Sequence, residues 1–309
     1  MTGTLASFLA MAVAGRELSA GLGTFEILFF RSLTGLVIIG AVLLKKRRGR
    51  VGSRHLSLHL LRNLAHFGGQ FGWFYGLAFI PLAEVFAIEF TVPVWTALLA
   101  ALILKEKLTA PRIAAVGLGI SGMLIILRPG LSVVTPAALA VLGGAVCYAL
   151  SHTLTRRLAQ TDAPIVILFY MTLIQLPLGF LPALRGWVTP SAAMWPWLLV
   201  VGGTALSGHY CMARAFALAD ATVVVPMDFL RLPLIALVGW LFYGEGIDAF
   251  VLGGAAVMLA GNVINIRAER LRHPAAPKAQ GSRSDGLVKS QFSDGSEKRP
   301  RSRLANPEE

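Results

Sequence analysis

The chain has 309 residues, of which 55% are hydrophobic and only 14% charged, and its mean hydropathy is +0.68. Soluble domains usually carry about 25% charged residues, so this composition excludes an ordinary soluble enzyme. The net charge is +12, but the basic residues gather in connecting segments and near the C-terminus, which argues against a nucleic-acid-binding face. Cys147 and Cys211 lie in apolar runs and predict neither a disulfide framework nor a zinc site. We expect an integral membrane protein.

Apolar runs of about 20 residues, the length needed to cross a bilayer as a helix, recur along the chain. Residues 271–309 differ, because they are rich in Pro, Ser, Gly and charged residues, and they predict a disordered cytoplasmic tail. The predicted fold class is an all-α integral membrane protein with ten transmembrane helices. The ten spans are about 1–15, 24–44, 58–79, 84–104, 111–128, 135–153, 164–182, 194–217, 221–242 and 248–266.

Lysine and arginine are divided unevenly between alternate connections. Ten lie in the segments 45–57, 105–110 and 154–163, whereas the connections on the other side hold only Arg16, Arg128 and Arg185. Positive charge marks the cytoplasmic connections of membrane proteins. We therefore expect a multi-pass protein of the bacterial inner membrane with both termini in the cytoplasm.

The two halves of the chain repeat each other. A shift of 139 residues aligns residues 75–128 with 214–267 without a gap. Because each copy has five predicted helices, an odd number, the second copy enters the membrane from the opposite side. Such inverted repeats are typical of secondary transporters that work by alternating access. The alignment places Glu89 on Asp228, Phe90 on Phe229 and Glu106 on Glu245.

The repeats are assigned to residues 1–130 and 135–267. The first span lacks several residues that its partner in the second repeat has, which favours a reading frame that starts upstream of Met1.

The segment Lys-Glu-Lys-Leu-Thr at 105–109, followed by the glycine-punctuated helix at 116–127, resembles an EamA domain. The second copy, at 243–248 and 252–255, matches more loosely. Together they resemble a ten-helix member of the drug/metabolite transporter superfamily. The resemblance implies a central cavity lined by spans 1–4 and 6–9. It also implies a role in exporting amino acids and metabolites, or in taking up compounds such as S-adenosylmethionine or riboflavin.

Ionisable side chains at membrane depth are costly and therefore mark candidate functional sites. Asp228 and Arg231 are three residues apart, so they can pair on one helix face. The candidate substrate- or proton-binding residues are Glu89, Asp228, Arg231, Arg31 and Arg214. For each the alternative is structural: an internal pair for Asp228 and Arg231, and for Glu89 a bond to Arg31 or Arg62.

Residue counting at about 1.5 Å per residue predicts Glu89 roughly 8 Å from the outer surface and Asp228 roughly 10 Å from the inner one. Glu106 and Glu245 are expected to be structural turn residues, with Thr109 and Asp248 capping the helices that follow.

Three further features receive structural interpretations. Arg62 is expected to extend toward the inner surface, and His55 and His59 to form a surface pair. Gly68, Gly72 and Gly76 predict close packing of span 3 against a neighbouring helix.

The leading hypothesis is a secondary active transporter for a small organic metabolite, amino-acid-like or otherwise carboxylate-bearing, because arginines lie at membrane depth. The first alternative is an uptake carrier for a cofactor or vitamin such as S-adenosylmethionine or riboflavin. An intramembrane enzyme or a non-transporting scaffold is the alternative from another class. We expect no enzymatic activity, catalytic residue, metal or cofactor, and the absence of a Walker A motif argues against ATP hydrolysis. The expected partners are a small-molecule substrate and lipid, with a homodimer as an option and no nucleic acid.

Overall fold

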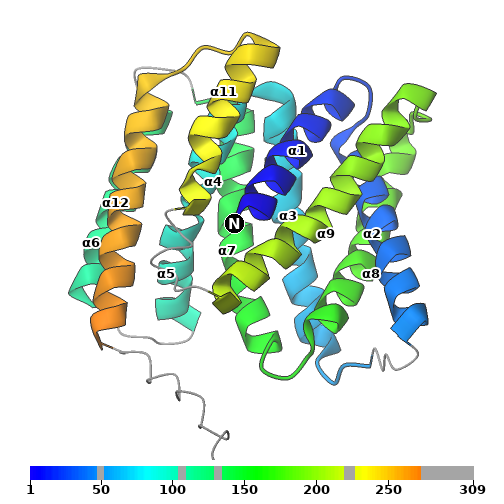
Figure 1. Ribbon diagram of the computed structural model, residues 1–309, viewed down its shortest axis with the longest axis horizontal. Coiled ribbons are helices and arrows are strands. Elements are labelled where there is room, and N and C mark those ends of the chain that lie inside the picture. The colour runs from blue at the N-terminus through cyan, green and yellow to red at the C-terminus, as the bar shows by residue number, and fades with distance from the viewer. Residues whose placement is uncertain (47–51, 104–108, 129–133, 219–226, 273–309) are drawn as a thin grey trace, which may run out of the picture. The chain divides into compact units, whose positions relative to one another are not determined.

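The computed structural model describes residues 1–46, 52–103, 109–128, 134–218 and 227–272, and every regular element within them is a helix (Figure 1). The helical body runs from Met1 to Glu269. The all-helical fold predicted from the sequence is confirmed. The first half forms α1 (Thr2–Ser19), α2 (Thr24–Lys46), α3 (Leu56–Phe79), α4 (Leu82–Glu89), α5 (Val92–Ile103) and α6 (Ala110–Leu127). The second half forms α7 (Pro136–Leu158), α8 (Pro164–Ala183), α9 (Trp195–Leu218), α11 (Arg231–Tyr243) and α12 (Ala249–Arg272).

Six helical stretches of the described chain are long and apolar enough to cross a membrane. They are Thr24–Lys45, Leu82–Leu99, Ala110–Leu127, Pro136–Thr155, Pro164–Gly186 and Ala249–Ala268. The helix α3 falls outside this set although it has 24 residues. Its apolar character is interrupted by a column of buried polar side chains, namely His59, Arg62, Asn63, His66 and Gln70. The helix α3 therefore directs a polar face into the interior of the protein.

Local sequence signals account for several helix ends. The side chain of Thr135 accepts a hydrogen bond from the backbone N–H of Ala138, and Pro136 opens α7. Gly244 ends α11 with a φ of +63°, in the left-handed region that glycine adopts without strain. Asp248, a predicted cap, accepts a hydrogen bond from the N–H of Phe250 at the start of α12. Thr109, the other predicted cap, makes no side-chain capping bond.

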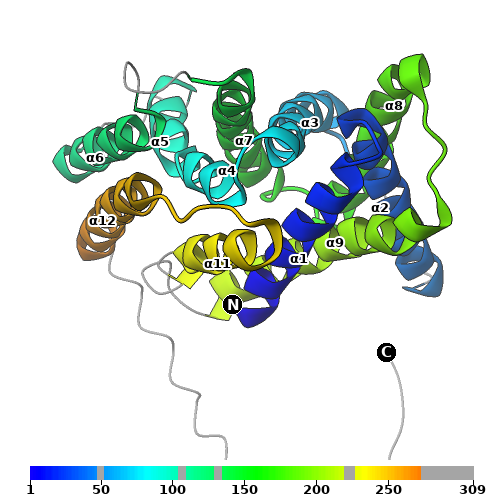
Figure 2. The same cartoon turned by 90° about the horizontal axis from the view of Figure 1, so that it is seen from above.

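The two halves of the chain interlock through equivalent helices. The helix α3 packs on α7, and the equivalent pair in the other half is α9 on α1. The helix α2 packs on α8, its own equivalent. The helix α4 packs on α11, which belongs to the equivalent fourth span of the second half and aligns with α5. Seen from above, these helices form one closely packed group, and α6 and α12 lie side by side at its edge (Figure 2). This pattern of contacts is the one that a two-fold internal symmetry produces.

The fourth span of each half is broken at the same aligned position. The helix α4 ends at Glu89, and Phe90 and Thr91 form a turn before α5 begins. In the second half a helical segment ends at Phe229, and Leu230 separates it from α11. Proline explains these breaks, because it lacks a backbone N–H and its ring clashes with the preceding turn. Pro93 and Pro233 each lie within three residues of the break.

Glycines permit the closest helix crossing. A Cβ on Gly72 of α3 would overlap the carbonyl oxygen of Ala140 on α7, and one on Gly76 would overlap the side chain of Val141. The predicted close packing of the glycine stripe on α3 is therefore confirmed, and its neighbour is α7. A second close crossing joins α6 to α12, where a Cβ on either Gly122 or Gly254 would lie 2.5 Å from the other's carbonyl oxygen.

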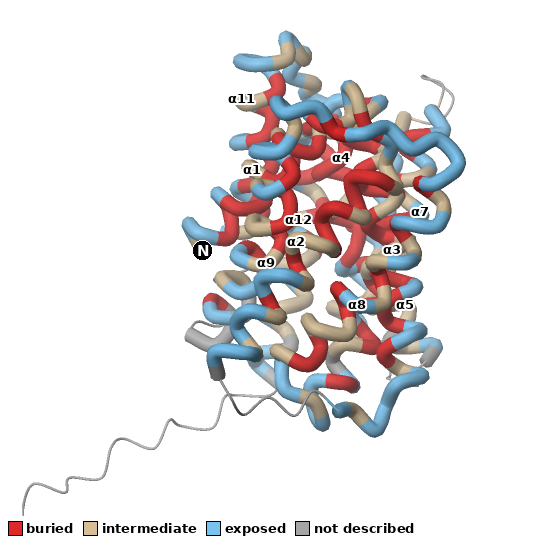
Figure 3. The backbone as a smooth tube through the Cα atoms, turned by 90° about the vertical axis from the view of Figure 1, so that its right-hand side faces the viewer, coloured by how far each residue is buried: buried red, intermediate tan, exposed pale blue. Residues whose placement is uncertain are grey.

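Buried residues concentrate in the middle of the helical body, and exposed ones lie at its ends and along its outer helices (Figure 3). Many exposed side chains are apolar, including Leu102 and Phe242, each 76% exposed. An apolar outer surface is what a lipid-facing helix requires.

Candidate functional site

A buried arginine joins two acidic residues from different halves of the chain. Arg231 is the first residue of α11, and its Nη2 lies 2.6 Å from Oδ2 of Asp228. Its Nη1 lies 3.5 Å from Oε1 of Glu89, the last residue of α4. The other oxygen of Glu89 accepts a 2.8 Å hydrogen bond from Nε1 of Trp73 on α3. We call Glu89, Arg231 and Asp228 the central ion bridge.

Aromatic rings enclose the central ion bridge. The guanidinium of Arg231 lies 4.9 Å from the ring centre of Phe8, 5.5 Å from that of Phe86 and 5.3 Å from that of Phe90. These distances allow cation–π attraction. Phe90 also stacks on Phe229 with ring centres 4.1 Å apart. Because Phe90 and Phe229 are aligned residues of the two repeats, this stack marks where the repeats meet.

The central ion bridge corrects two expectations about Glu89. Its ion-pair partner among the described residues is Arg231, so the structural alternative, a bond to Arg31 or Arg62, is wrong. The predicted placement of Glu89 and Asp228 toward opposite surfaces is also wrong, because one guanidinium contacts both carboxylates. The predicted local pair of Asp228 and Arg231 is present.

A second group of polar side chains converges from four helices. It comprises Arg31 of α2, Arg62 and His66 of α3, His152 of α7 and His209 of α9, and we call it the arginine–histidine cluster. Arg31 interacts electrostatically with Arg62, His66 and His209. The ring of His66 lies 6.2 Å from that of His209 and 5.5 Å from that of Tyr148.

Hydrogen bonds fix one side of the arginine–histidine cluster. Nε of Arg62 donates to Oγ1 of Thr155, and Nη1 donates to Oδ1 of Asn63. Amide nitrogens of Gln70 and Gln175 lie 2.8 and 3.0 Å from Nδ1 of His66. Arg62 is therefore held within the protein and only 7% exposed. The prediction that it extends toward the inner surface is wrong.

Arg31 differs from Arg62 because nothing in the described chain holds it. It is only 5% exposed, and its guanidinium forms no hydrogen bond or ion pair with any described residue. Its Nε is buried without a partner, as are Nδ2 of Asn63 and the Oε1 atoms of Gln70 and Gln175. Buried polar atoms are normally paired, so this group has unused capacity to bind a ligand.

The other predicted site residues lie elsewhere. Arg214 is exposed on α9 and has no hydrogen bond or ion pair within the described chain. Glu245 does more than shape a turn, since Oε1 lies 3.0 Å from Nη2 of Arg16 and Oε2 accepts a 2.8 Å bond from the N–H of Leu82. It thus ties α11 to both α1 and α4. Glu106, its aligned residue, lies outside the described residues.

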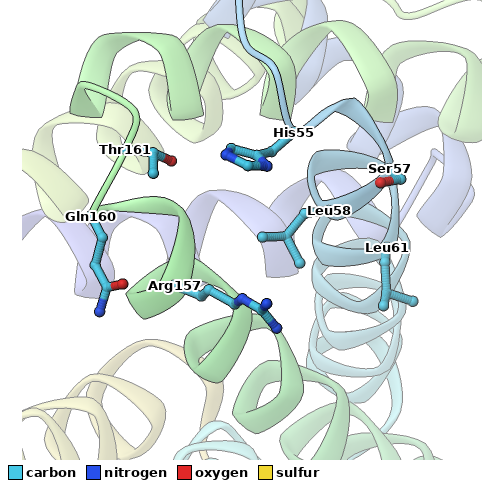
Figure 4. A pocket seen from close by; sticks show the side chains of 7 residues that line it. All are labelled: His55, Ser57, Leu58, Leu61, Arg157, Gln160 and Thr161. Atoms are coloured by element: carbon cyan, nitrogen blue, oxygen red, sulfur yellow. The ribbon is translucent and has the colours of Figure 1, made fainter.

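His59 is another departure from the sequence-based interpretation. It was expected at the surface, but it is 0% exposed, and Nε2 lies 2.7 Å from Oδ2 of Asp162 in the α7–α8 connection. Burial raises the pKa of the Asp162 carboxyl, but the hydrogen bonds from Ser53 and His59 outweigh this and leave it below its ordinary value. His55, which is exposed, lines a small pocket with residues of α3 and the end of α7 (Figure 4).

Neither the central ion bridge nor the arginine–histidine cluster could be located from local spacing alone. The signal available was the number of polar residues in α3, at positions 59, 62, 63, 66 and 70. These positions follow the three- and four-residue spacing of one helix face, which indicates a shared polar face directed away from lipid. Among the described residues, no three His, Cys, Asp or Glu side chains are placed to share a metal ion.

Comparisons with known proteins agree with this architecture. The family model of the EamA-like transporter family matches residues 3–128 and 135–267. The riboflavin transporter of Rhizobium johnstonii is 32% identical over 271 residues, which cover 87% of each chain. The S-adenosylmethionine uptake transporter of Rickettsia prowazekii is 24% identical over 258 residues, 84% of this chain and 88% of the relative. A solved crystal structure with 19% identity matches 87% of this chain and 96% of its own with a TM-score of 0.61.

Proposed function

Because the chain belongs to the EamA-like transporter family, we propose that it is a secondary carrier that takes up a vitamin- or cofactor-sized metabolite by alternating access. The observation that carries this proposal is the central ion bridge. Glu89 and Asp228 come from the two repeats, next to equivalent helix breaks, and share Arg231. In transporters built from inverted repeats, substrate and coupling ions bind near such broken helices.

The central ion bridge can couple the binding of a proton or a cationic group to the movement of the two halves. When the two halves move relative to one another, the longer contact of Arg231, 3.5 Å to Glu89, is the one that crosses between them. Its loss leaves Glu89 without a cation at low dielectric, where a carboxylate takes up a proton or a cationic group more readily. Asp228 stays with Arg231 through the 2.6 Å contact within its own segment.

Both relatives support an uptake carrier for a vitamin or cofactor over the amino-acid-like solute that the sequence favoured. One is named a riboflavin transporter and the other an S-adenosylmethionine uptake transporter. Both compounds contain a flat heterocycle. Beside Arg31, ring contacts link Phe8 to His209, His209 to His66 and His66 to Tyr148, and aromatic side chains of this kind pack well against a flat ring. Riboflavin and S-adenosylmethionine are the two substrates to test.

Uptake measurements test this proposal directly. The gene is expressed in bacteria that require external riboflavin and lack a carrier of their own, and growth and uptake of labelled riboflavin are measured. S-adenosylmethionine uptake is measured in parallel. We expect uptake of one of the two, loss of that uptake in Arg231→Gln, and retention in Arg185→Gln, an exposed arginine in a connection. A well-folded protein that carries neither compound would contradict the proposed function. Vesicle assays with the purified protein separate transport from metabolism and address the intramembrane-enzyme alternative.

A further inference from the structure

The arginine–histidine cluster holds positive charge that no acidic residue of the described chain compensates. Arg62 donates only to the neutral side chains of Thr155 and Asn63. Arg31 has no hydrogen-bond or ion-pair partner among the described residues, and its electrostatic interactions are with Tyr148, Arg62, His66 and His209. An unpaired charge in a low-dielectric interior is strongly unfavourable. The two buried guanidinium groups are therefore expected to bind an anion in at least one state of the transport cycle.

The chemistry of Arg31 matches that requirement. A guanidinium presents its N–H groups in a planar fork, which binds a carboxylate or a phosphate through two parallel hydrogen bonds. The Nε atom of Arg31 is buried and unused, so this face of the fork is free. His152, from α7, interacts electrostatically with Arg62 and is exposed. The cluster therefore combines positive charge with unused hydrogen-bond donors.

The fold itself does not require an arginine at this position. An alignment of the two repeats at a shift of 140 places Arg31 on Met171, an apolar residue that is 2% exposed. The scaffold thus accepts a buried apolar side chain at the equivalent position of the other repeat. Because only the first repeat has an arginine at this position, Arg31 is expected to serve a binding role that the second repeat does not share.

We propose that the arginine–histidine cluster is an anion subsite in which Arg31 binds a carboxylate or phosphate of the transported solute. This inference rests on the proposed function and names the feature by which the carrier selects its substrate. Phe8 joins the anion subsite to the central ion bridge, because its ring centre lies 5.5 Å from that of His209 and 4.9 Å from the guanidinium of Arg231. A solute held at Arg31 by its anionic group extends past Phe8 toward the carboxylates of Glu89 and Asp228.

Pairs of compounds that differ in one anionic group test the subsite. The first pair is flavin mononucleotide and riboflavin, which differ by a phosphate. The second is S-adenosylhomocysteine and its carboxamide, in which a neutral amide replaces the carboxylate. Binding to the purified wild-type protein in detergent is measured by calorimetry, which avoids any effect of membrane permeability. We expect the member that has the anionic group to bind about tenfold or more tightly than the member that lacks it, in at least one pair.

Variants of Arg31 then test whether this residue causes the tighter binding of the compound with the anionic group. In Arg31→Gln the preference should fall to about twofold or less, and Arg31→Lys should keep part of it, because lysine retains the charge but lacks the fork. Arg185→Gln is the control and should keep all of it. Melting curves establish whether each variant is folded. If Arg31→Gln does not fold, the proposal is tested by whether the preference falls in Arg31→Lys.

The outcomes separate the subsite from the proposed function. Equal binding of both members of each pair by the wild type overturns the anion subsite. So does a preference as large as the wild type's in folded Arg31→Gln or, if that variant does not fold, in Arg31→Lys. Riboflavin uptake that persists in either case leaves the carrier function standing. Tight anion binding without any uptake supports the subsite and contradicts the carrier function.

Discussion

Arg231 shows how a single residue organises the centre of this protein. Under the 139-residue shift it aligns with Val92, so only one repeat supplies a cation. That cation pairs with the aligned carboxylates of both repeats, at 2.6 and 3.5 Å. Removal of one member of a buried ion pair leaves an uncompensated charge, which costs more than the pair itself contributes. The two acids are therefore expected to respond differently to neutralisation.

Asp228→Asn should reduce stability more than Glu89→Gln. The asparagine removes the shorter contact to Arg231, and we expect a loss of about 3 kcal/mol or less, because both carboxylates are partly exposed. A glutamine at position 89 keeps an oxygen to accept the bond from Trp73, so folding is largely retained. Unfolding in detergent measures this difference.

Glu89→Gln should instead abolish or strongly reduce uptake while the protein remains folded, because the residue no longer takes up and releases a proton. Glu84→Gln, on the same helix and outside the central ion bridge, is the matched control and should transport normally. If the dependence of uptake on pH is the same in Glu89→Gln as in the wild type, Glu89 has no part in coupling and serves only in packing.

At the level of helices, the fold has an interrupted fourth span in each half and two close helix crossings, α3 with α7 and α6 with α12. The breaks after Glu89 and Phe229 share the aligned turn residues Thr91 and Leu230, so the fourth span is interrupted at an equivalent place in both repeats. The crossing of α3 and α7 depends on glycine, because Gly72 and Gly144 face each other and the Cβ position built on Gly144 lies 3.5 Å from Cα of Gly72. The arginine–histidine cluster draws residues from both of these helices, so their separation sets its geometry.

Gly72→Ala should therefore destabilise the protein. Its Cβ would overlap the backbone of α7 at Ala140, and backbone cannot rotate away as a side chain can. Overpacking of this kind costs about 1–3 kcal/mol. Gly143→Ala is the control on the partner helix, because a Cβ there would meet nothing within 4 Å, and alanine favours helix over glycine by about 1 kcal/mol. Thermal unfolding in detergent compares them, and equal melting temperatures would contradict the close crossing.

At the scale of the whole molecule, ion pairs join the two halves at one end. Arg16 pairs with Glu245 and also donates to the backbone oxygen of Ile80. Arg128 and Asp248 form a second pair at this end. Arg16 lies in the last turn of α1, and Glu245 and Asp248 lie in the α11–α12 connection. This connection is at the top of Figure 1, opposite the α7–α8 connection. The distribution of lysine and arginine predicts that this end faces away from the cytoplasm.

Reporter fusions test that orientation. A reporter placed after Gly49 or Asp285 should be active on the cytoplasmic side, and one placed after Trp187 should be active on the outer side. The physical reason is the preference of basic connections for the cytoplasm. An outer location of the Asp285 fusion would contradict the even number of spans and, with it, the inverted repeat.

The helices, the repeat and the pair of Asp228 with Arg231 could be predicted from the sequence, because each depends on residues whose spacing along the chain is fixed. An apolar run of about 20 residues dictates a membrane helix, and two residues three apart meet on one helix face whatever surrounds them. The same logic identified the glycine stripe of α3 and the membrane-depth arginines as notable.

The contacts between side chains of different helices could not be predicted from the sequence, because they depend on how the helices pack. Glu89 and Arg231 are far apart in the chain, and their contact depends on the packing of α4 against α11. The burial of His59 against Asp162 and the convergence of Arg31 with Arg62 depend in the same way on how whole helices pack. Polar residues on a membrane helix face inward to avoid lipid, but the partner that each one finds there is set by the crossing geometry, which local sequence spacing does not encode.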